Sequence, residues 1–208
     1  MCNRKIPKSV IERIPLYINY LDSLISQNIN MTSSTIMAQD LGLGEVQVRK
    51  DLNLISGNGK PKIGYYVQDL RKDFEALVRN KDYTNIIIIG AGKIGEALAN
   101  YYKYEDSKFK LLGIFDNDKN KIGKVIDGVT IEHINNIKEF CEHHIIDIGI
   151  ICVPPQNAQE VCDLMIESNI KGILNFTNIV LNVNNNVCVR NVDIVSLLTK
   201  IAIEINNE

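Results

Sequence analysis

The sequence has no C-x-x-C pair, no low-complexity tract, no internal repeat of 20–50 residues and no apolar run that approaches 18 residues. Without a long apolar run, no membrane-spanning helix is expected. The opening MCNRKIPKSV also lacks the apolar centre of a secretory signal, so we expect a cytoplasmic protein with no membrane partner. An ordinary composition, 45% hydrophobic and 23% charged over 208 residues, predicts one large globular domain or two small ones.

The cysteines and histidines show no metal-binding or disulfide pattern. The five cysteines are Cys2, Cys141, Cys152, Cys162 and Cys188. Such an odd, scattered set indicates free thiols in a reducing compartment, and buried inert thiols are favoured over redox-sensing ones. The three histidines, His133, His143 and His144, have no ligand spacing with cysteine, so no metal site is expected.

Charge divides the chain into a basic front and an acidic rear. Residues 1–80 carry eleven Lys or Arg against eight Asp or Glu, a net of +3, and residues 81–208 carry twelve against seventeen, a net of −5. The sum recovers the net charge of −2. This asymmetry favours two modules, of which only the first faces a polyanion.

A glycine-rich turn follows the apolar run NIIII and leads into a predicted helix. Its spacing is Gly90-x-Gly92-x-x-Gly95. Gly90 allows a sharp turn, Gly92 allows close approach of a pyrophosphate, and Gly95 allows the helix to pack on the strand. The expected phosphate-binding residues are Gly90, Ala91, Gly92, Lys93, Ile94 and Gly95. The alternative is a glycine turn that binds nothing.

A second predicted strand, FKLLGIFD, ends in Asp116, 21 residues beyond Gly95. A carboxylate at this place binds the adenosine ribose hydroxyls and repels a 2′-phosphate, which favours NAD(H) over NADP(H). Lys119 and Lys121 nearby would weaken that preference.

The rest of the rear half alternates strands and helices, which predicts a doubly wound parallel sheet. Ligands bind beyond the carboxyl ends of such strands, so Val153–Pro154 and Asn175–Phe176 are expected to border the nicotinamide, with plain strand-end turns as the alternative. Only 33 residues follow Asn175, and they contain no His–Asp pair and no Tyr-x-x-x-Lys. We therefore expect no catalytic residues and a nucleotide that acts as a signal.

The front half contains a helix-turn-helix pattern. A short helix TIMAQDL, capped by Ser33 or Ser34, precedes the turn at 42–44 and the helix EVQVRKDLNLIS. The glycine- and lysine-containing segment SGNGKPKIGYY then predicts a wing. The candidate DNA contacts are Ser33, Ser34, Gln47, Arg49, Lys50, Asn53, Lys60, Lys62 and Tyr65. A small helical domain with solvated cations is the alternative.

The C-terminal segment DIVSLLTKIAIEI is predicted to be a helix with apolar residues on two sides. Such a helix needs two surfaces to cover it, which favours a partner subunit over burial within its own chain.

Taken together, the chain resembles the Rex family of redox-sensing transcriptional repressors. The resemblance runs from about residue 6 to residue 198 through KIPKSVIERIPLY, VRKDL, GAGKIGEALANY, FDNDKNKIG, VPPQNAQ, ILNF and NVD. It implies a homodimer that binds double-stranded operator DNA through winged-helix domains and releases it when NADH binds. Tyr101 matches a family tyrosine near the nicotinamide, and Asp193 matches an acid that reaches across the dimer.

The chain departs from the family pattern in two places. The wing, residues 54–62, has Leu54 and Ile55 where family members carry aromatic residues, and Pro61 fixes its backbone differently. Asn19 stands where members often carry an arginine that pairs with the acid matched by Asp193. These departures bear on operator choice and on the strength of nucleotide coupling.

We therefore expect an α/β chain in three parts: a winged helix-turn-helix domain (residues 1–80), a Rossmann-like NAD(H)-binding domain (81–190) and a swapped dimerisation helix (191–208). The expected function is a redox-sensing repressor that responds to the NADH/NAD⁺ ratio. The alternatives are a small NAD(H)-dependent oxidoreductase and a family relative with altered DNA or nucleotide response.

Overall fold

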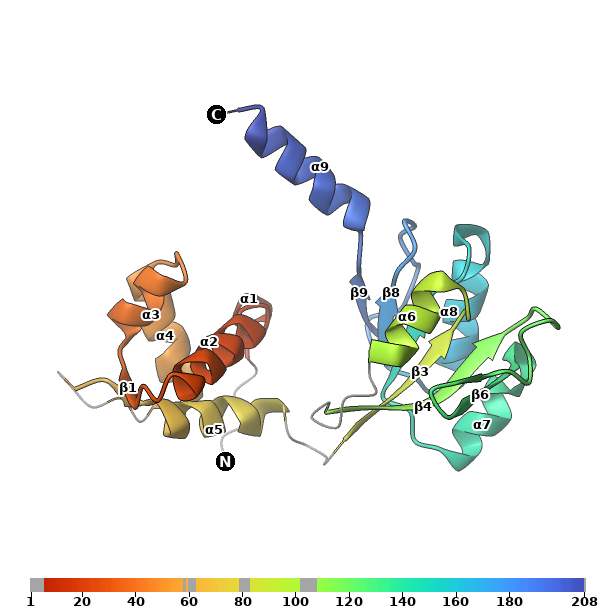
Figure 1. Cartoon of the computed structure of the whole chain (residues 1–208), viewed down its shortest axis with the longest axis horizontal. Helices are drawn as coiled ribbons and strands as arrows, with labels where there is room; N and C mark the ends of the chain where they lie inside the picture. The colour runs from red at the N-terminus through yellow and green to blue at the C-terminus, as the bar shows by residue number, and fades with distance from the viewer. Residues whose placement is uncertain (1–5, 58, 60–62, 79–82, 102–107, 208) are drawn as a thin grey trace. The chain divides into compact units, whose positions relative to one another are not determined.

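The computed structural model describes residues 6–57, 59, 63–78, 83–101 and 108–207 and divides the chain into two compact units, Met1–Lys81 and Asp82–Glu208 (Figure 1). The first is a helical unit with a two-stranded sheet, and the second is built on a seven-stranded sheet. Each unit has buried clusters of its own. The fold is of the α/β class, as the sequence indicates.

The first unit is a helix-turn-helix with supporting helices. Its elements are α1 (Lys8–Ile11), α2 (Ile14–Ser26), β1 (Met31–Thr32), α3 (Ser34–Asp40), α4 (Glu45–Ile55), β2 (Tyr65–Tyr66) and α5 (Val67–Val78). Gly42, at φ +64°, forms the turn between α3 and α4, a conformation that favours glycine. Val48 and Leu52 of α4 are fully buried and pack with Met37 of α3 and Leu21 of α2.

The described part of the predicted wing contributes one strand, β2. It pairs antiparallel with β1, so that Met31 lies opposite Tyr66 and Thr32 opposite Tyr65. Gly64, at φ +97°, fits tightly here, because a Cβ would lie 2.2 Å from the carbonyl oxygen of Thr32. The base of the wing is thereby fixed to the segment that leads into α3.

The second unit alternates strands and helices. Its elements are β3 (Thr84–Ile89), α6 (Lys93–Tyr101), β4 (Phe109–Asp116), β5 (Val125–Ile126), β6 (Val129–His133), η1 (Ile134–Asn136), α7 (Ile137–His143), β7 (Ile148–Ile151), η2 (Pro155–Asn157), α8 (Ala158–Glu167), β8 (Gly172–Asn175), β9 (Cys188–Asn191) and α9 (Ile194–Ile205). The strand order is β5-β6-β4-β3-β7-β8-β9, and every pair except β5–β6 is parallel.

Alternating isoleucines of β3 fill the two faces of this sheet. Ile87 and Ile89 join a cluster that includes residues of α7 and α8, whereas Ile86 and Ile88 join a cluster that includes Ala99 of α6. All four are buried, and each contributes about 1.5–3 kcal/mol of burial free energy. A strand buried on both faces appears in the sequence as a continuous apolar run, as NIIII does.

The C-terminal helix α9 forms as expected, but none of the residues that the structure describes buries it. Asp193 caps it by accepting a hydrogen bond from the Ser196 backbone N–H at 2.9 Å. None of its residues is buried, and Val195 is 72% exposed. Burial of this helix within its own subunit, the simpler alternative, is not observed.

Candidate functional site

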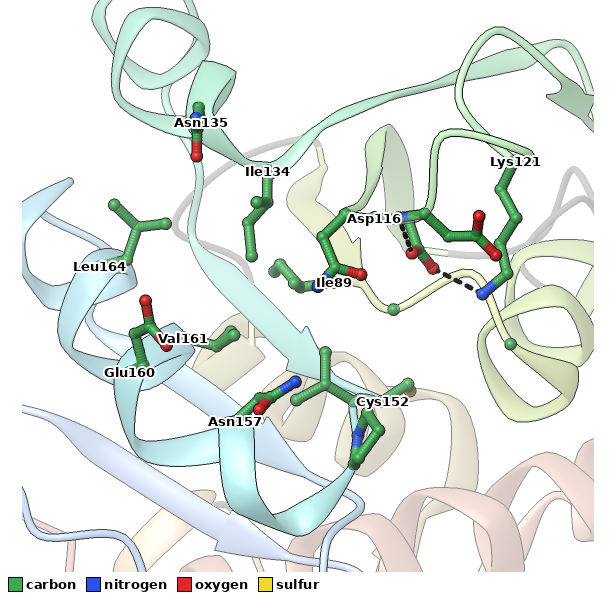
Figure 2. Close-up of a pocket in the computed structure, with 16 residues that line it drawn as sticks. Ile89, Asp116, Lys121, Ile134, Asn135, Cys152, Asn157, Glu160, Val161 and Leu164 are labelled. Atoms are coloured by element: carbon green, nitrogen blue, oxygen red, sulfur yellow. Dashed lines mark hydrogen bonds and ion pairs between the residues drawn. The ribbon is translucent and has the colours of Figure 1, made fainter.

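The order of the strands creates the main cavity of the second unit. The chain proceeds from β3 to β4 and β6 on one side, then crosses to β7 and β8 on the other, so the topology switches between β3 and β7. Doubly wound sheets bind ligands at this point. A cavity of about 640 Å³ opens there, beyond the carboxyl ends of β3, β4 and β7 (Figure 2).

Three glycines shape one wall of the cavity, and each is needed for a different reason. Gly90 has φ +100°, and a Cβ on it would lie 2.5 Å from the Cys152 carbonyl oxygen. A Cβ on Gly95 would lie 2.0 Å from the Gly90 carbonyl oxygen, so α6 packs directly on the turn. Gly92 lines the cavity, and a Cβ there would meet nothing within 4 Å. Packing within the chain therefore explains Gly90 and Gly95, whereas the bare backbone at Gly92 leaves space for a ligand.

Asp116 ends β4 at the same cavity, and its carboxylate is held from three sides. Oδ2 accepts from the Ala91 backbone N–H at 2.8 Å and from Lys121 Nζ at 2.9 Å, and Oδ1 accepts from the Asp118 backbone N–H at 2.8 Å. These contacts fix the carboxylate beside the glycine turn (Figure 2).

The electrostatic surroundings keep Asp116 ionised. Burial acts to raise its pKa, but the hydrogen bonds from Asp118, Lys121 and Ala91 outweigh burial, and the pKa lies below its ordinary value of 3.8. The site therefore presents a negative charge with a cation beside it at neutral pH.

The remaining predicted nucleotide contacts fall into two groups. Val153 and Pro154 line the cavity. Ala91 is buried in the turn after β3, and Lys93 and Ile94 are exposed in the first turn of α6. None of these three residues is among those that line the cavity.

Besides Ala91, Lys93, Ile94 and Gly95 of the turn, four predicted residues lie outside the cavity lining. Tyr101 is the last residue of α6 and is 68% exposed, and Asp193 caps α9. Asn175 is fully buried, and its Nδ2 donates to the Ile179 carbonyl oxygen and to Asn191 Oδ1, both at 3.0 Å. Phe176 packs on the sheet face that carries α6. Asn175 thus has a structural role in joining β8 to β9.

Several cavity residues were not predicted from the sequence. They are Ile89, Asn117, Asp118, Ile134, Asn135, Cys152, Asn157, Glu160, Val161 and Leu164. Ile134 and Asn135 are the first two residues after β6, so the rule that ligands bind at strand ends could have found them. Glu160 and Leu164 lie on one face of α8, four residues apart, which only the packing of that helix reveals.

Cys152, which follows β7, also lines the cavity. Burial raises its pKa to about 12. The thiol is therefore protonated at neutral pH.

The helix-turn-helix of the first unit provides the candidate DNA surface. Ser33 is the N-cap of α3, because its Oγ accepts from the Ile36 backbone N–H at 3.2 Å, and Ser34 is the first helical residue. On α4, Gln47, Lys50 and Asn53 are exposed. The predicted polar residues therefore lie on the outer side of the second helix.

Two further candidates of this surface have partners on or beside α4. Arg49 is exposed and lies 3.9 Å from Glu45, one helical turn earlier. Tyr65 is only 8% exposed, and its hydroxyl donates to Asn53 Oδ1 at 3.4 Å. Tyr65 thus holds the Asn53 side chain through this hydrogen bond. Lys60 and Lys62 lie outside the residues that the structure describes.

An ion pair between the buried Asp51, on the inner face of α4, and the partly buried Arg13 was not anticipated. Arg13 Nε and Nη2 donate to the two oxygens of Asp51 at 2.7 and 3.0 Å, and the Tyr17 hydroxyl donates to Oδ2 at 2.8 Å. The sequence contains the signal, because Asp51 interrupts the apolar stripe of Val48 and Leu52 on the inner face of the helix. An acid in such a place requires a cation or hydrogen-bond donors.

The described residues contain no group of three or more His, Cys, Asp or Glu side chains placed to hold a metal ion. Within the same residues, no helix is long and apolar enough to span a bilayer.

Two family models match the chain. The model described as "CoA binding domain" matches residues 81–179, and the one described as "Putative DNA-binding protein N-terminus" matches residues 5–53. These matches follow the division into two units.

Curated relatives match over nearly the whole chain. A "Redox-sensing transcriptional repressor Rex" of Caldicellulosiruptor bescii is 37% identical over 205 residues, 99% of this chain and 94% of that one. The protein of the same name from Clostridium acetobutylicum is 40% identical over 197 residues, 94% of this chain and 92% of that one.

Solved structures agree. RSP, described as a Rex-family repressor, is 34% identical and superposes with a TM-score of 0.89 over 99% of this chain and 96% of that one. The structure of RSP in complex with β-NAD⁺ and operator DNA has a TM-score of 0.91 and 34% identity, and covers 99% of this chain and 94% of that chain. Identity at this level over both units, with the glycine turn and helix-turn-helix in place, means that the chain belongs to the Rex family of redox-sensing transcriptional repressors.

Proposed function

We propose that this protein represses transcription by binding operator DNA and is released from it when NADH binds, so that it responds to the NADH/NAD⁺ ratio. The observation that carries the proposal is the pairing, at one cavity, of the open backbone at Gly92 with the fixed carboxylate of Asp116, in a chain that also has an exposed helix-turn-helix. The structures of RSP with β-NAD⁺ and operator DNA, and with β-NADH, support it. The family consists of repressors, so the alternative of a small oxidoreductase is set aside.

In this proposal the pyrophosphate lies against the turn from Gly90 to Gly95 and the N-terminal end of α6, as in other glycine-turn sites. Asp116 accepts from the adenosine ribose hydroxyls. The nicotinamide extends toward Val153 and Pro154, with Phe176, Tyr101 and Asp193 as the remaining contacts. Asn175 would act indirectly, by fixing the end of β8 that precedes Phe176. A neutral dihydronicotinamide enters an apolar pocket more readily than the cationic oxidised ring, and this difference would supply the redox discrimination.

Coenzyme A is the competing ligand that the matching domain model raises. It shares the adenosine diphosphate moiety with NAD, which the glycine turn would hold in either case. The free 3′-phosphate of coenzyme A would lie beside the ribose-binding carboxylate of Asp116, which disfavours it electrostatically. Coenzyme A therefore belongs in any binding test as a competitor.

On the DNA side, α4 is the proposed recognition helix. Gln47 and Asn53 would meet base edges, while Arg49, Lys50, Lys60 and Lys62 would contact phosphates. Ser33 and Ser34 would contact the backbone, and Tyr65 would act through Asn53. Two such helices read an inverted repeat when they lie about one DNA turn, roughly 34–36 Å, apart.

A homodimer supplies the second helix, and α9 is its proposed link. Within the chain α9 exposes apolar side chains on two sides, including Leu198 and Ile201, which a partner subunit would cover. We therefore assign DNA binding to residues 1–80, nucleotide binding to 81–190 and dimerisation to 191–208. A protein that acts on DNA in this way works in the cytoplasm.

The test is DNA binding at fixed salt without nucleotide and with saturating NAD⁺, NADH or coenzyme A. Salt is held constant because phosphate contacts alone change affinity by orders of magnitude. The DNA is the upstream region of the protein's own gene, with a consensus family operator as a second probe. We expect NADH alone to release the DNA; a 100-fold effect requires about 2.7 kcal/mol of differential affinity between the two states.

Two other outcomes are informative. DNA binding that ignores both nucleotides would identify a relative whose sensor is uncoupled, and Asn19→Arg would then be tested for restored coupling. Failure to bind either DNA would contradict the repressor function and implicate the altered wing.

A further inference from the structure

Arg13 forms an ion pair with one residue of the proposed recognition helix α4 and also contacts a second residue of that helix. Arg13, before α2, uses Nε and Nη2 to bind Asp51, on the inner face of α4. A guanidinium has only donors, so hydrogen-bond complementarity orients the Gln47 amide with its oxygen toward it. In this orientation the oxygen accepts from Nη1 at 2.8 Å and lies 3.3 Å from Nε, whose single hydrogen already donates to Asp51. One arginine therefore contacts two residues of α4 that lie four positions apart.

The arginine itself is firmly held. Asp51 is only 4% exposed, and the Tyr17 hydroxyl gives its carboxylate a further hydrogen bond at 2.8 Å. The hydrogen bond to Asp51 is the largest of the effects that raise the pKa of Arg13 above its ordinary value. A guanidinium has a rigid fork of five N–H donors, so fixing two of its nitrogens on Asp51 also fixes the direction of the third.

This orientation decides what Gln47 can offer a base. A free glutamine amide pairs with adenine by accepting from N6 and donating to N7. The Gln47 oxygen faces Arg13 and accepts from Nη1, so it is turned inward and away from the N6 of an adenine in the groove. The NH₂ group occupies the other branch of the planar amide, so it points away from Arg13. Gln47 is exposed and therefore presents hydrogen-bond donors to the groove.

We propose that Arg13 is a positioning residue for operator reading: it turns the Gln47 oxygen inward, so that Gln47 recognises the acceptor edge of a guanine, N7 and O6, instead of an adenine. Asn53 follows the same pattern, because its oxygen accepts from the buried Tyr65 hydroxyl. The proposal rests on operator DNA binding as the function of α4. It adds a base preference and a residue, Arg13, that itself touches no DNA.

The first experiment examines the free protein. The full-length chain is labelled with ¹⁵N-glutamine, and the side-chain NH₂ signals of Gln47 are assigned by their loss in Gln47→Ala. Arg13→Lys keeps a cation for Asp51 but lacks the fork that reaches both partners. We expect it to shift the Gln47 signals and leave the other glutamines unchanged. Unshifted Gln47 signals would overturn the proposed contact.

The second experiment measures base preference. The tightest-binding duplex is selected from a randomised pool, and each base pair of a half-site is then replaced in turn. We expect one guanine whose replacement by adenine weakens wild-type binding roughly tenfold, within the range of one base contact. Arg13→Lys should reduce that penalty at this position alone. In the Gln47→Ala background, Arg13→Lys should have no effect on base preference.

Arg49→Lys is the matched control on the same helix, and its effect should add to that of Arg13→Lys without coupling. If Arg13→Lys weakens binding to every duplex equally, Arg13 is only structural and the proposal fails. If Arg13→Lys does not fold, the neutral pair Arg13→Gln with Asp51→Asn replaces it, since it leaves no unpaired buried charge. If the wild type selects no duplex, the repressor function itself fails, whereas selection without coupling overturns the positioning role alone.

Discussion

Lys121 Nζ lies 2.9 Å from Asp116 Oδ2, so the carboxylate proposed to bind ribose already has a cation beside it. Lys121 is 33% exposed at its side chain, and Asp116 only 7%. The acid is thus fixed by the fold, while the cation is able to move toward a ligand. Whether the site prefers NAD(H) or NADP(H) depends on both.

Removing this cation should sharpen the preference for NADH. In Lys121→Ala, a 2′-phosphate would face Asp116 without a compensating charge, so NADPH affinity should fall by about 1 kcal/mol more than NADH affinity. Isothermal titration calorimetry with both nucleotides measures the two losses. Lys119→Ala, on the same loop, serves as the control. Equal losses for NADH and NADPH in Lys121→Ala would mean that Lys121 does not face the 2′ position.

Asp116 should contribute to stability in a pH-dependent way. Its folded pKa lies below 3.8, so the ionised form is favoured by folding. This stabilisation is present above the ordinary pKa and is lost as pH falls through the folded value. Urea unfolding followed by circular dichroism should show the wild type more stable than Asp116→Asn at pH 7. The two proteins should converge once the pH is below the folded pKa of Asp116; a gap that persists there would point to lost packing.

Two glycines of the turn should have different roles: Gly95 is needed for folding and Gly92 for nucleotide binding. Gly95→Ala places a Cβ 2.0 Å from the Gly90 carbonyl oxygen and should destabilise the second unit by about 1–3 kcal/mol. Gly92→Ala meets no atom within 4 Å, so it should leave the melting temperature unchanged and reduce NADH affinity at least tenfold. Thermal unfolding and nucleotide titration of both variants check this. Normal affinity in Gly92→Ala would place the pyrophosphate elsewhere.

The buried ion pair of the first unit should matter more to stability than its exposed counterpart. Arg13→Met leaves Asp51 buried without its cation and should cost about 3 kcal/mol. Arg49→Met breaks only the exposed 3.9 Å pair with Glu45 and should change stability by less than about 0.5 kcal/mol. Chemical unfolding of the two variants gives the comparison. Similar effects would mean that Asp51 finds another donor.

Charging α9 should dissociate the proposed dimer without unfolding the subunit. Leu198 and Ile201 are 61% and 51% exposed within the chain, so aspartate at both positions should remove little packing inside it. Analytical ultracentrifugation should show a monomer with unchanged circular dichroism. Lys200→Asp, on the same helix, controls for the added charge. A double variant that remains dimeric would place the subunit contact elsewhere.

The elements of the fold follow closely from local patterns in the sequence. NIIII with Gly90 and Gly95 predicts β3, the turn and α6, because strand, turn and helix each have a local signal. The pair Ser33 or Ser34 predicts the start of α3 for the same reason, since capping involves only neighbouring residues, and Ser33 is the cap in the structure. FKLLGIFD likewise predicts β4 and places Asp116 at its end.

Features that depend on contacts distant in sequence were harder to foresee. The pairing of β2 with β1 joins residues more than thirty positions apart. Arg13 and Asp51 are separated by 38 positions, and only the packing of α2 on α4 brings them together. Asn175 was expected at the ligand because it ends β8, yet its amide is bonded to Ile179 and Asn191.

The partly buried thiol of Cys152 has a consequence for the oxidants that can modify the cavity. A thiol whose pKa is raised to about 12 holds almost no thiolate at neutral pH, and peroxides react with the thiolate. Hydrogen peroxide should therefore leave this wall of the cavity unmodified over times that convert a low-pKa cysteine to a sulfenic acid. The cavity can therefore respond to the NADH/NAD⁺ ratio without oxidation of Cys152 by hydrogen peroxide.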